Sequence, residues 1–168
     1  WRGNAENDGF NRLVLRASLG WRQVAVLRAY CKYLMQAGVP FSQSYVESTM
    51  ARYPLLARLL VELFEARFDP ATGRESKAEI KQGQERFAQQ LRGLAGGDEA
   101  ALAVLQGVID ARNETRERQA EAIHKALRKL LDGVSSLDDD RILRSYMGVI
   151  DATLRTNYYI KYRDGLRA

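Results

Sequence analysis

Few side chains in this sequence are of the types that build catalytic or metal sites. The single histidine, His124, cannot supply the roughly four ligands of a structural zinc site, and we interpret it as a surface residue. The single cysteine, Cys31, lies among apolar residues of a predicted helix, where a thiol usually packs as a small hydrophobic group. We therefore predict no catalytic and no metal-binding residues.

An acidic run and a glycine cluster also have structural explanations. The three aspartates at 138–140 follow Ser135 and Ser136. Consecutive helical side chains point about 100° apart, so the three do not converge on one ion. Serine caps and first-turn carboxylates instead stabilise the start of a helix. The glycines at 93, 96 and 97 lack the G-x-G-x-x-G spacing of a dinucleotide phosphate loop. The sequence therefore predicts no cofactor-binding residues.

The spacing of apolar side chains predicts helices along the whole chain. Turn signals separate them: Gly38 follows one helix, Pro54 opens another, and Asp98 caps a third. No segment reads as a convincing strand, so we predict an all-α fold with an irregular helical core. The expected helices cover residues 4–17, 21–37, 43–52, 54–68, 75–94, 99–132 and 138–160.

Two of these helices are expected to build most of the core. The helix over 21–37 is apolar around most of its circumference, which is typical of a central helix. The helix over 54–68 carries leucines on one face and Arg58, Glu62 and Glu65 on the other. We expect the leucines to point inward and the three charged side chains to face water.

The longest predicted helix covers residues 99–132, which contain no proline and one glycine, Gly107. A heptad phase persists through a polar middle, which predicts one helix of about 50 Å whose centre projects into solvent or contacts another part of a larger protein. The alternative is two helices with a break near Asn113. Gly133 then turns the chain, so 99–132 and 138–160 are expected to form a long projecting antiparallel hairpin.

Composition places the chain among ordinary globular proteins. Its 168 residues are 46% hydrophobic and 28% charged, which suits one domain with its own core. No apolar run approaches the roughly 20 residues that span a bilayer, and a single cysteine fits a reducing cytoplasm. We expect a piece of a longer protein, organised as a compact multi-helix core over 1–74, a polar helix and a long helix over 75–134, and a last helix over 135–168.

The net charge of +5 raises the alternative of a nucleic-acid-binding or protein-interaction domain. The helices over 21–37, 43–52 and 54–68 are separated by tight turns and could mimic a helix-turn-helix. The basic residues are scattered singly, however, and the candidate recognition helix would present Gln43 beside Glu47, whose carboxylate repels phosphate. A solvated surface explains the charge better, and we expect no nucleic-acid partner.

Three blocks of the sequence resemble the large NAD-specific glutamate dehydrogenases of bacteria. They are residues 6–45, ENDGFNRLVLRASLGWRQVAVLRAYCKYLMQAGVPFSQSY, residues 53–70, YPLLARLLVELFEARFDP, and residues 137–159, LDDDRILRSYMGVIDATLRTNYY. In that family the resembling segment is helical and lies after the N-terminal regulatory region and just before the catalytic domain. The resemblance covers nearly the whole chain and is weakest over 76–119.

The resemblance implies a function that the residues themselves do not show. The parent enzyme would oxidatively deaminate L-glutamate to 2-oxoglutarate and ammonia with NAD, and its dinucleotide fold and catalytic lysine would lie downstream. The segment itself would be inactive, would hold no NAD, and would position the catalytic domain and contribute to assembly. Its expected partners are the catalytic and regulatory regions of the same polypeptide and further copies in a cytoplasmic homo-oligomer, with no membrane contact.

Arg155, Asn157 and Tyr158 are the candidate docking residues. They end the predicted helix over 138–160, just before the position at which the family's catalytic domain begins. A guanidinium, an amide and a phenol bind backbone and carboxylate partners well, and Tyr and Arg are enriched in interface hot spots. We therefore predict that they contact the catalytic domain. The alternative is that Arg155 only pairs with Asp151 one turn earlier.

Overall fold

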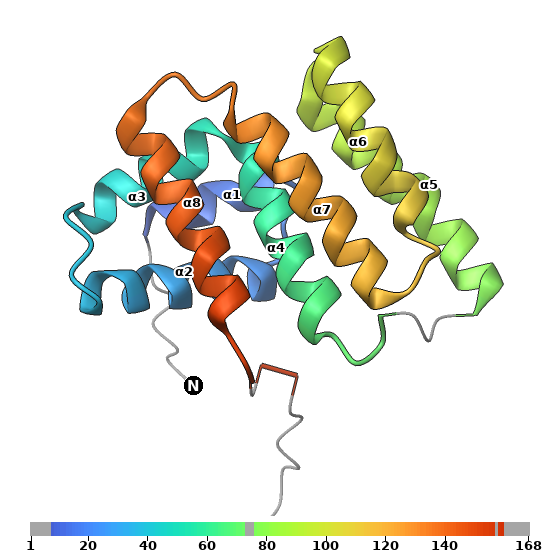
Figure 1. The fold of residues 1–168 in the computed structure, drawn as a ribbon, viewed down its shortest axis with the longest axis horizontal. Helices are drawn as coiled ribbons and strands as arrows, with labels where there is room; N and C mark the ends of the chain where they lie inside the picture. The colour runs from blue at the N-terminus through green and yellow to red at the C-terminus, as the bar shows by residue number, and fades with distance from the viewer. Residues whose placement is uncertain (1–7, 73–75, 157, 160–168) are drawn as a thin grey trace, which may run out of the picture.

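The computed structural model describes residues 8–72, 76–156 and 158–159, and these residues form packed helices without a strand (Figure 1). The all-α fold class predicted from the apolar spacing is confirmed. No helix in these ranges is both long and apolar enough to cross a bilayer. The elements are a 3-10 turn η1 (Gly9–Arg12) and the helices α1 (Leu13–Arg16), α2 (Trp21–Gln36), α3 (Gln43–Arg52), α4 (Pro54–Phe68), α5 (Lys77–Ala95), α6 (Glu99–Ala111), α7 (Arg116–Leu131) and α8 (Leu137–Ala152).

Several helix ends lie where the turn chemistry of the sequence places them. α2 stops before Gly38, whose φ of 82° is one that glycine tolerates. Ser42 caps α3 by accepting a hydrogen bond from the Tyr45 backbone N–H at 3.2 Å, and Pro54 opens α4. The Asp98 carboxylate caps the first turn of α6 in the same way. Local signals therefore set these boundaries.

α4 lies at the centre of the fold, and the helix predicted over 21–37 contributes Val24, Val26, Leu27, Cys31 and Leu34 to the same core. α4 contacts α2, α3, α5, α7 and α8, and it lies in the middle of the molecule with α2 towards one edge (Figure 1). Part of the apolar surface of α2 faces outward, because Trp21 and Tyr33 are 74% and 55% exposed. α2 is therefore a core helix with one exposed apolar face, and α4 is the more enclosed of the two.

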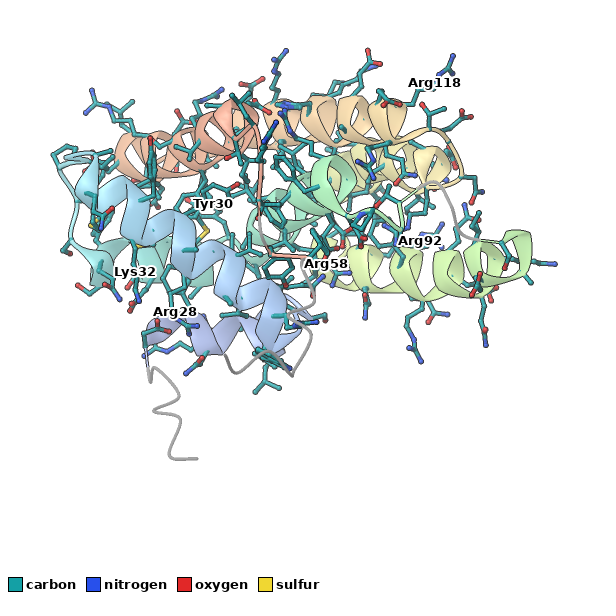
Figure 2. The ribbon with its side chains drawn as sticks, turned by 90° about the horizontal axis from the view of Figure 1, so that it is seen from below. Arg28, Tyr30, Lys32, Arg58, Arg92 and Arg118 are labelled. Carbon is teal, nitrogen blue, oxygen red and sulfur yellow. The ribbon has the colours of Figure 1, made fainter. Side chains whose placement is uncertain are left out.

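Arg58 and Glu62 of α4 lie inside the fold, contrary to the prediction that they face water. They are 6% and 3% exposed, and Arg58 Nε donates to Glu62 Oε1 at 2.7 Å. Arg58 also donates to the Ser18 carbonyl at 2.7 Å, and Arg112 donates to the second Glu62 oxygen at 3.3 Å. Figure 2 shows Arg58 within the molecule, whereas Arg118 on α7 points outward. Mutual pairing allows these charges to be buried.

The predicted single helix over 99–132 is wrong, and the alternative of two helices is correct. α6 and α7 are separated by a turn, and the Thr115 hydroxyl caps the first turn of α7. The side-chain amide of Gln119 donates to the carbonyl oxygens of Arg112 at 3.1 Å and Glu114 at 2.9 Å. The polar middle of the heptad pattern is therefore a capped turn whose carbonyl groups are satisfied by a side chain.

The long projecting hairpin of 99–132 with 138–160 consequently does not form. α7 packs against α6 and along α4, and α8 contacts α2, α3 and α4 as well as α7. α5 and α6 lie side by side at the end of the molecule away from α2 (Figure 1). As two shorter helices, α6 and α7 can each bury an apolar face against the fold, whereas a single helix projecting into solvent would leave much of that apolar surface exposed. The face of α7 that is buried comprises Gln119, Ile123, Ala126, Leu127 and Leu131.

The last helix ends at Ala152 instead of continuing to residue 160. Thr153 adopts extended backbone with φ −69° and ψ 122°. The chain then places Tyr158 and Tyr159 against Phe64 of α4, with ring centroids 5.5 and 6.1 Å from the Phe64 centroid. The non-helical segment thus allows both tyrosine rings to pack against α4.

Candidate docking surface

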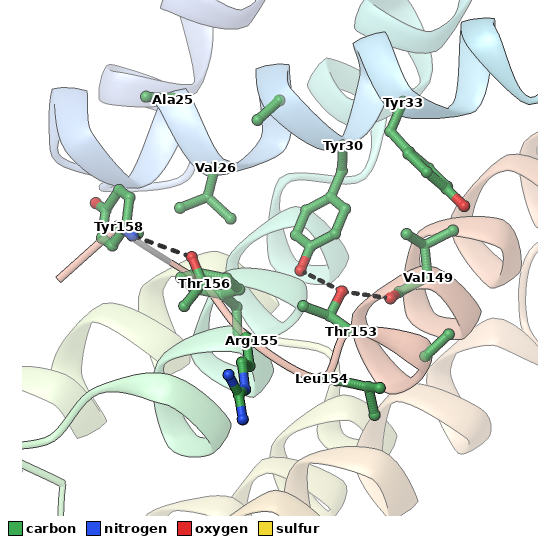
Figure 3. A pocket seen from close by; sticks show the side chains of 13 residues that line it. Ala25, Val26, Tyr30, Tyr33, Val149, Thr153, Leu154, Arg155, Thr156 and Tyr158 are labelled. Atoms are coloured by element: carbon green, nitrogen blue, oxygen red, sulfur yellow. Dashed lines mark hydrogen bonds between the residues drawn. The ribbon is translucent and has the colours of Figure 1, made fainter. Parts of the chain in front are cut away.

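A groove of about 940 Å³ opens between α2 and the segment that ends and follows α8 (Figure 3). α2 contributes the small side chains of Ala25 and Ala29 and the ring of Tyr33 to its lining, and α8 contributes Val149 and Ala152. Alanines four residues apart lie on one face of a helix. They leave space above α2 that larger side chains would fill. The lining is mostly apolar.

The polar groups on the groove floor bond to one another. The Tyr30 hydroxyl lies 3.0 Å from the Thr153 hydroxyl, which in turn donates to the Val149 carbonyl at 2.7 Å (Figure 3). Because the Thr153 proton is used towards Val149, Tyr30 is the donor in the first contact. Burial raises the pKa of the Tyr30 phenol. The hydroxyl groups of Tyr30 and Thr153 therefore already have hydrogen-bond partners within the fold.

Two of the three predicted docking residues lie at this groove. Arg155 and Tyr158 are among its lining side chains, whereas Asn157 lies outside the described residues. Tyr158 is half-buried with its ring edge-on to Phe64, and burial raises the pKa of its phenol. Arg155 is exposed. The structure brings Arg155 and Tyr158 to one surface, although on a non-helical segment and not on a helix as expected.

The alternative pairing of Arg155 with Asp151 is not formed. Asp151 Oδ1 instead accepts a hydrogen bond from Arg67 of α4 at 3.1 Å and lies 2.7 Å from Nε2 of His124 on α7. The His124 side chain is 21% exposed and engaged, so it is not the free surface residue that we predicted. Sequence reasoning missed this junction because the three residues lie on three separate helices and no motif relates them.

Asp139 has a larger role than the first-turn charge assigned to the aspartates at 138–140. The predicted cap is present, since the Asp139 N–H donates to Ser136 Oγ at 3.3 Å. Its carboxylate is buried and accepts hydrogen bonds from Thr49 Oγ1 at 2.9 Å and from Arg52. Burial raises the pKa of Asp139, but the hydrogen bonds from Arg52 and Thr49 outweigh it and hold the pKa below its usual value. This carboxylate fixes α8 to α3.

The face of α3 considered for base recognition is occupied by contacts within the fold. Gln43 Nε2 donates to Glu47 Oε1 at 2.8 Å, and Glu47 Oε2 accepts from the Gly9 backbone N–H at 3.0 Å. Arg52, at the end of the same helix, is paired with Asp139. These side chains are not available to bases without breaking those contacts. The helix-turn-helix alternative gains no support.

Cys31 is buried, as predicted, with 1% of its surface exposed. Burial raises the pKa of its thiol, which makes it a poor nucleophile. Among the described residues, no group of three or more His, Cys, Asp or Glu side chains could hold a metal ion.

Two family models match separate parts of the chain. The model described as glutamate dehydrogenase, helical motif 3, matches residues 5–70. The model described as bacterial NAD-glutamate dehydrogenase, catalytic domain, matches residues 126–168. The second match starts inside α7 and includes α8. The resemblance had led us to expect the catalytic domain only after the end of this chain, so the matched boundary lies earlier than expected.

Relatives match almost the whole chain. NAD-specific glutamate dehydrogenases of Mycobacterium tuberculosis, Halomonas elongata and Pseudomonas aeruginosa are 37%, 38% and 38% identical to it. The alignments cover 99%, 98% and 94% of this chain but only 8%, 8% and 7% of the relatives. The chain therefore spans less than a tenth of the length of these relatives. No solved structure matches it.

Proposed function

Because this chain is homologous along 99% of its length to NAD-specific glutamate dehydrogenases of bacteria, we propose that it is a non-catalytic helical segment of such an enzyme. The parent oxidatively deaminates L-glutamate to 2-oxoglutarate and ammonia with NAD, in the cytoplasm and as a homo-oligomer. The segment positions the catalytic region relative to the rest of the polypeptide and contributes to assembly. Its partners are the catalytic and regulatory regions of the same polypeptide.

The observation that carries this proposal is the packed junction between the two matched regions. α8 falls in the catalytic-domain match, and α2, α3 and α4 fall in the helical-motif match. Tyr146 of α8 is fully buried and its hydroxyl donates to the Leu27 carbonyl of α2 at 3.0 Å. Asp139 at the other end of α8 is bonded to Thr49 of α3. These two contacts fix α8 of the catalytic-domain match on the helices of the helical-motif match, which supports a positioning role.

Arg155, Asn157 and Tyr158 form part of the docking edge in this proposal. Arg155 and Tyr158 line the groove beside α8, and Arg155 is exposed while Asp151, four residues earlier, is already engaged by Arg67. Arginine and tyrosine are enriched in interface hot spots. Position and chemistry both support contact with the catalytic region.

The test uses the full-length parent enzyme. Arg155→Ala with Asn157→Ala should impair glutamate-dependent NAD reduction or assembly, while Arg141→Ala, which removes an exposed arginine from α8 away from the groove, should leave both unchanged. Steady-state kinetics and analytical ultracentrifugation give the two measurements. If the double variant has the kinetics and oligomeric state of the wild type, these residues have no docking role.

The non-catalytic assignment has its own test. The isolated chain is expected neither to reduce NAD with glutamate nor to bind NAD, because the sequence has no glycine-rich phosphate loop of the required spacing. Isothermal titration calorimetry of the chain with NAD measures this directly. Saturable binding at millimolar or lower NAD would contradict the assignment.

A further inference from the structure

The groove between α2 and α8 is an apolar surface that the described residues leave open. We propose that it takes an α-helix from another part of the same parent polypeptide, with an apolar face in the groove and an acidic side chain against Arg155. This inference rests on the proposed function, since it identifies what the docking edge binds.

The shape of the groove suits a helix. Ala25 and Ala29 form a strip of small side chains along α2, and Ala152 lies on the opposite wall. Helices approach closely where residues four apart are small, because ridges of one helix enter the grooves of the other. Tyr33 and Leu154 are 55% and 90% exposed beside this strip. Both side chains are therefore accessible to a partner that enters the groove.

The hydrogen bonding of the floor favours a helix over an extended peptide. An extended segment buried in the groove would need partners for its backbone N–H and C=O groups. The polar side chains of the floor are already bonded, Tyr30 to Thr153 and Thr153 to the Val149 carbonyl. A helix satisfies its own backbone groups and needs only apolar contact. The occupant therefore brings a satisfied backbone and an apolar face.

Arg155 defines the polar end of the contact. It is exposed at the rim of the groove, and Asp151, the acidic residue four positions before it in the sequence, is held by Arg67 and His124. A guanidinium beside an apolar surface pairs well with a carboxylate, because the pair can form two parallel hydrogen bonds. An acidic residue on the incoming helix would pair with Arg155 and would fix the position of that helix along the groove.

The source of the helix is the same polypeptide. The chain spans only 8% of the length of its relatives from Mycobacterium tuberculosis and Halomonas elongata, so most of a parent of that size lies outside it. The wall formed by residues 152–156 and Tyr158 belongs to the catalytic-domain match, so this groove lies at the junction itself.

Photo-crosslinking in the full-length parent tests the proposal. Tyr33→p-benzoylphenylalanine places a photoreactive ring at the groove with little change in shape, and Gln36→p-benzoylphenylalanine places it on exposed α2 surface outside the lining. Circular dichroism spectra and melting temperatures equal to those of the wild type verify that both variants fold. After irradiation, mass spectrometry should find the Tyr33 variant joined within one polypeptide to a helical peptide outside residues 1–168. A crosslink between subunits, a crosslink confined to residues 1–168, or a yield no higher than that of the Gln36 variant would overturn the proposal.

A second variant tests the charge. Arg155→Glu in the Tyr33 photo-crosslinking background should lower the yield several-fold, and Arg155→Lys should retain most of it. An unchanged yield with Arg155→Glu would show that no acidic group faces this position. The crosslink and the turnover measurement test the two proposals separately. If the Tyr33 variant crosslinks as expected but the Arg155→Ala, Asn157→Ala enzyme keeps wild-type turnover, only the positioning role is rejected. If the Arg155→Ala, Asn157→Ala enzyme loses turnover but the Tyr33 variant gives no such crosslink, only the proposal of a helix in the groove is rejected.

Discussion

The hydroxyl of Tyr146 on α8 donates a hydrogen bond to the backbone carbonyl oxygen of Leu27 on α2, 3.0 Å away and 119 residues earlier in the chain. Tyr146 is among the largest fully buried side chains of the fold. The bond crosses from the catalytic-domain match to the helical-motif match. The junction of the two regions is therefore an interior contact of one helical body.

Tyr146→Phe should lower the free energy of unfolding of the chain by about 1 kcal/mol, the usual net value of a buried hydrogen bond, because the ring still fills its site. Tyr33→Phe, at an exposed position, should change it by less than about 0.5 kcal/mol. Urea unfolding followed by circular dichroism measures both. Equal stabilities of the two variants would show that the Tyr146 hydroxyl contributes nothing.

Cys31→Ala should destabilise the chain by about 1 kcal/mol or more, because it removes a packed atom from a site that is 1% exposed. The native thiol should also react with a bulky maleimide only at the rate of unfolding. Labelling followed by mass spectrometry, with and without urea, gives the comparison. Rapid labelling without urea would mean that the α2 packing is wrong.

Asp139→Asn should lower the free energy of unfolding by about 2 kcal/mol near neutral pH, the range for hydrogen bonds to a charged group. The lowered native pKa means that this stabilisation is present above the unfolded-state pKa and is lost as the pH falls through the native pKa. The difference between wild type and variant should therefore shrink as the pH falls below 3.8, the ordinary pKa of the carboxyl group. Exposed Asp138→Asn is the control; a gap that stays constant with pH would contradict the assignment.

How much of this could be read from the sequence depends on whether a signal is local. Gly38 and Pro54 determine their own backbone geometry, so the boundaries beside them were predictable. The heptad spacing continues across the break between α6 and α7, so apolar periodicity alone predicts one continuous helix there. The decisive feature of the break is Gln119, whose amide reaches back to two carbonyl groups, and such a contact exists only in the folded turn.

Charged residues whose partners lie on other helices were the least predictable. Arg58 meets Glu62 one turn away, but their burial depends on α5 and α6 covering them, and spacing along α4 carries no such information. The groove was only partly predictable. Arg155 and Tyr158 were identified by residue type, whereas Ala25 and Ala29 offered no chemical signal and line it because they are small.

Glu65 was also expected to face water, and its side chain is largely buried on α4. Its carboxylate accepts one hydrogen bond from Gln23 Nε2 at 2.9 Å. Burial, and then the negative charge of Glu62, raise its pKa from 4.5 to about 7. The folded state therefore holds a proton on Glu65 at a pH at which the unfolded chain has released it.

The consequence is a pH-dependent stability that Glu65→Gln should remove. The folded protein binds the proton more tightly than the unfolded chain, so the favourable contribution is complete below about pH 4.5 and is lost as the pH rises through 7. Glutamine keeps the shape and the contact with Gln23 but carries no charge. The variant should match the wild type near pH 5 and exceed its free energy of unfolding at about pH 8.5 by up to about 3 kcal/mol. Urea unfolding at both pH values is the measurement, with exposed Glu121→Gln as the control. If the Glu65 variant and the Glu121 control lose the same stability between the two pH values, Glu65 is ionised in the folded protein at neutral pH and its burial is compensated by other groups.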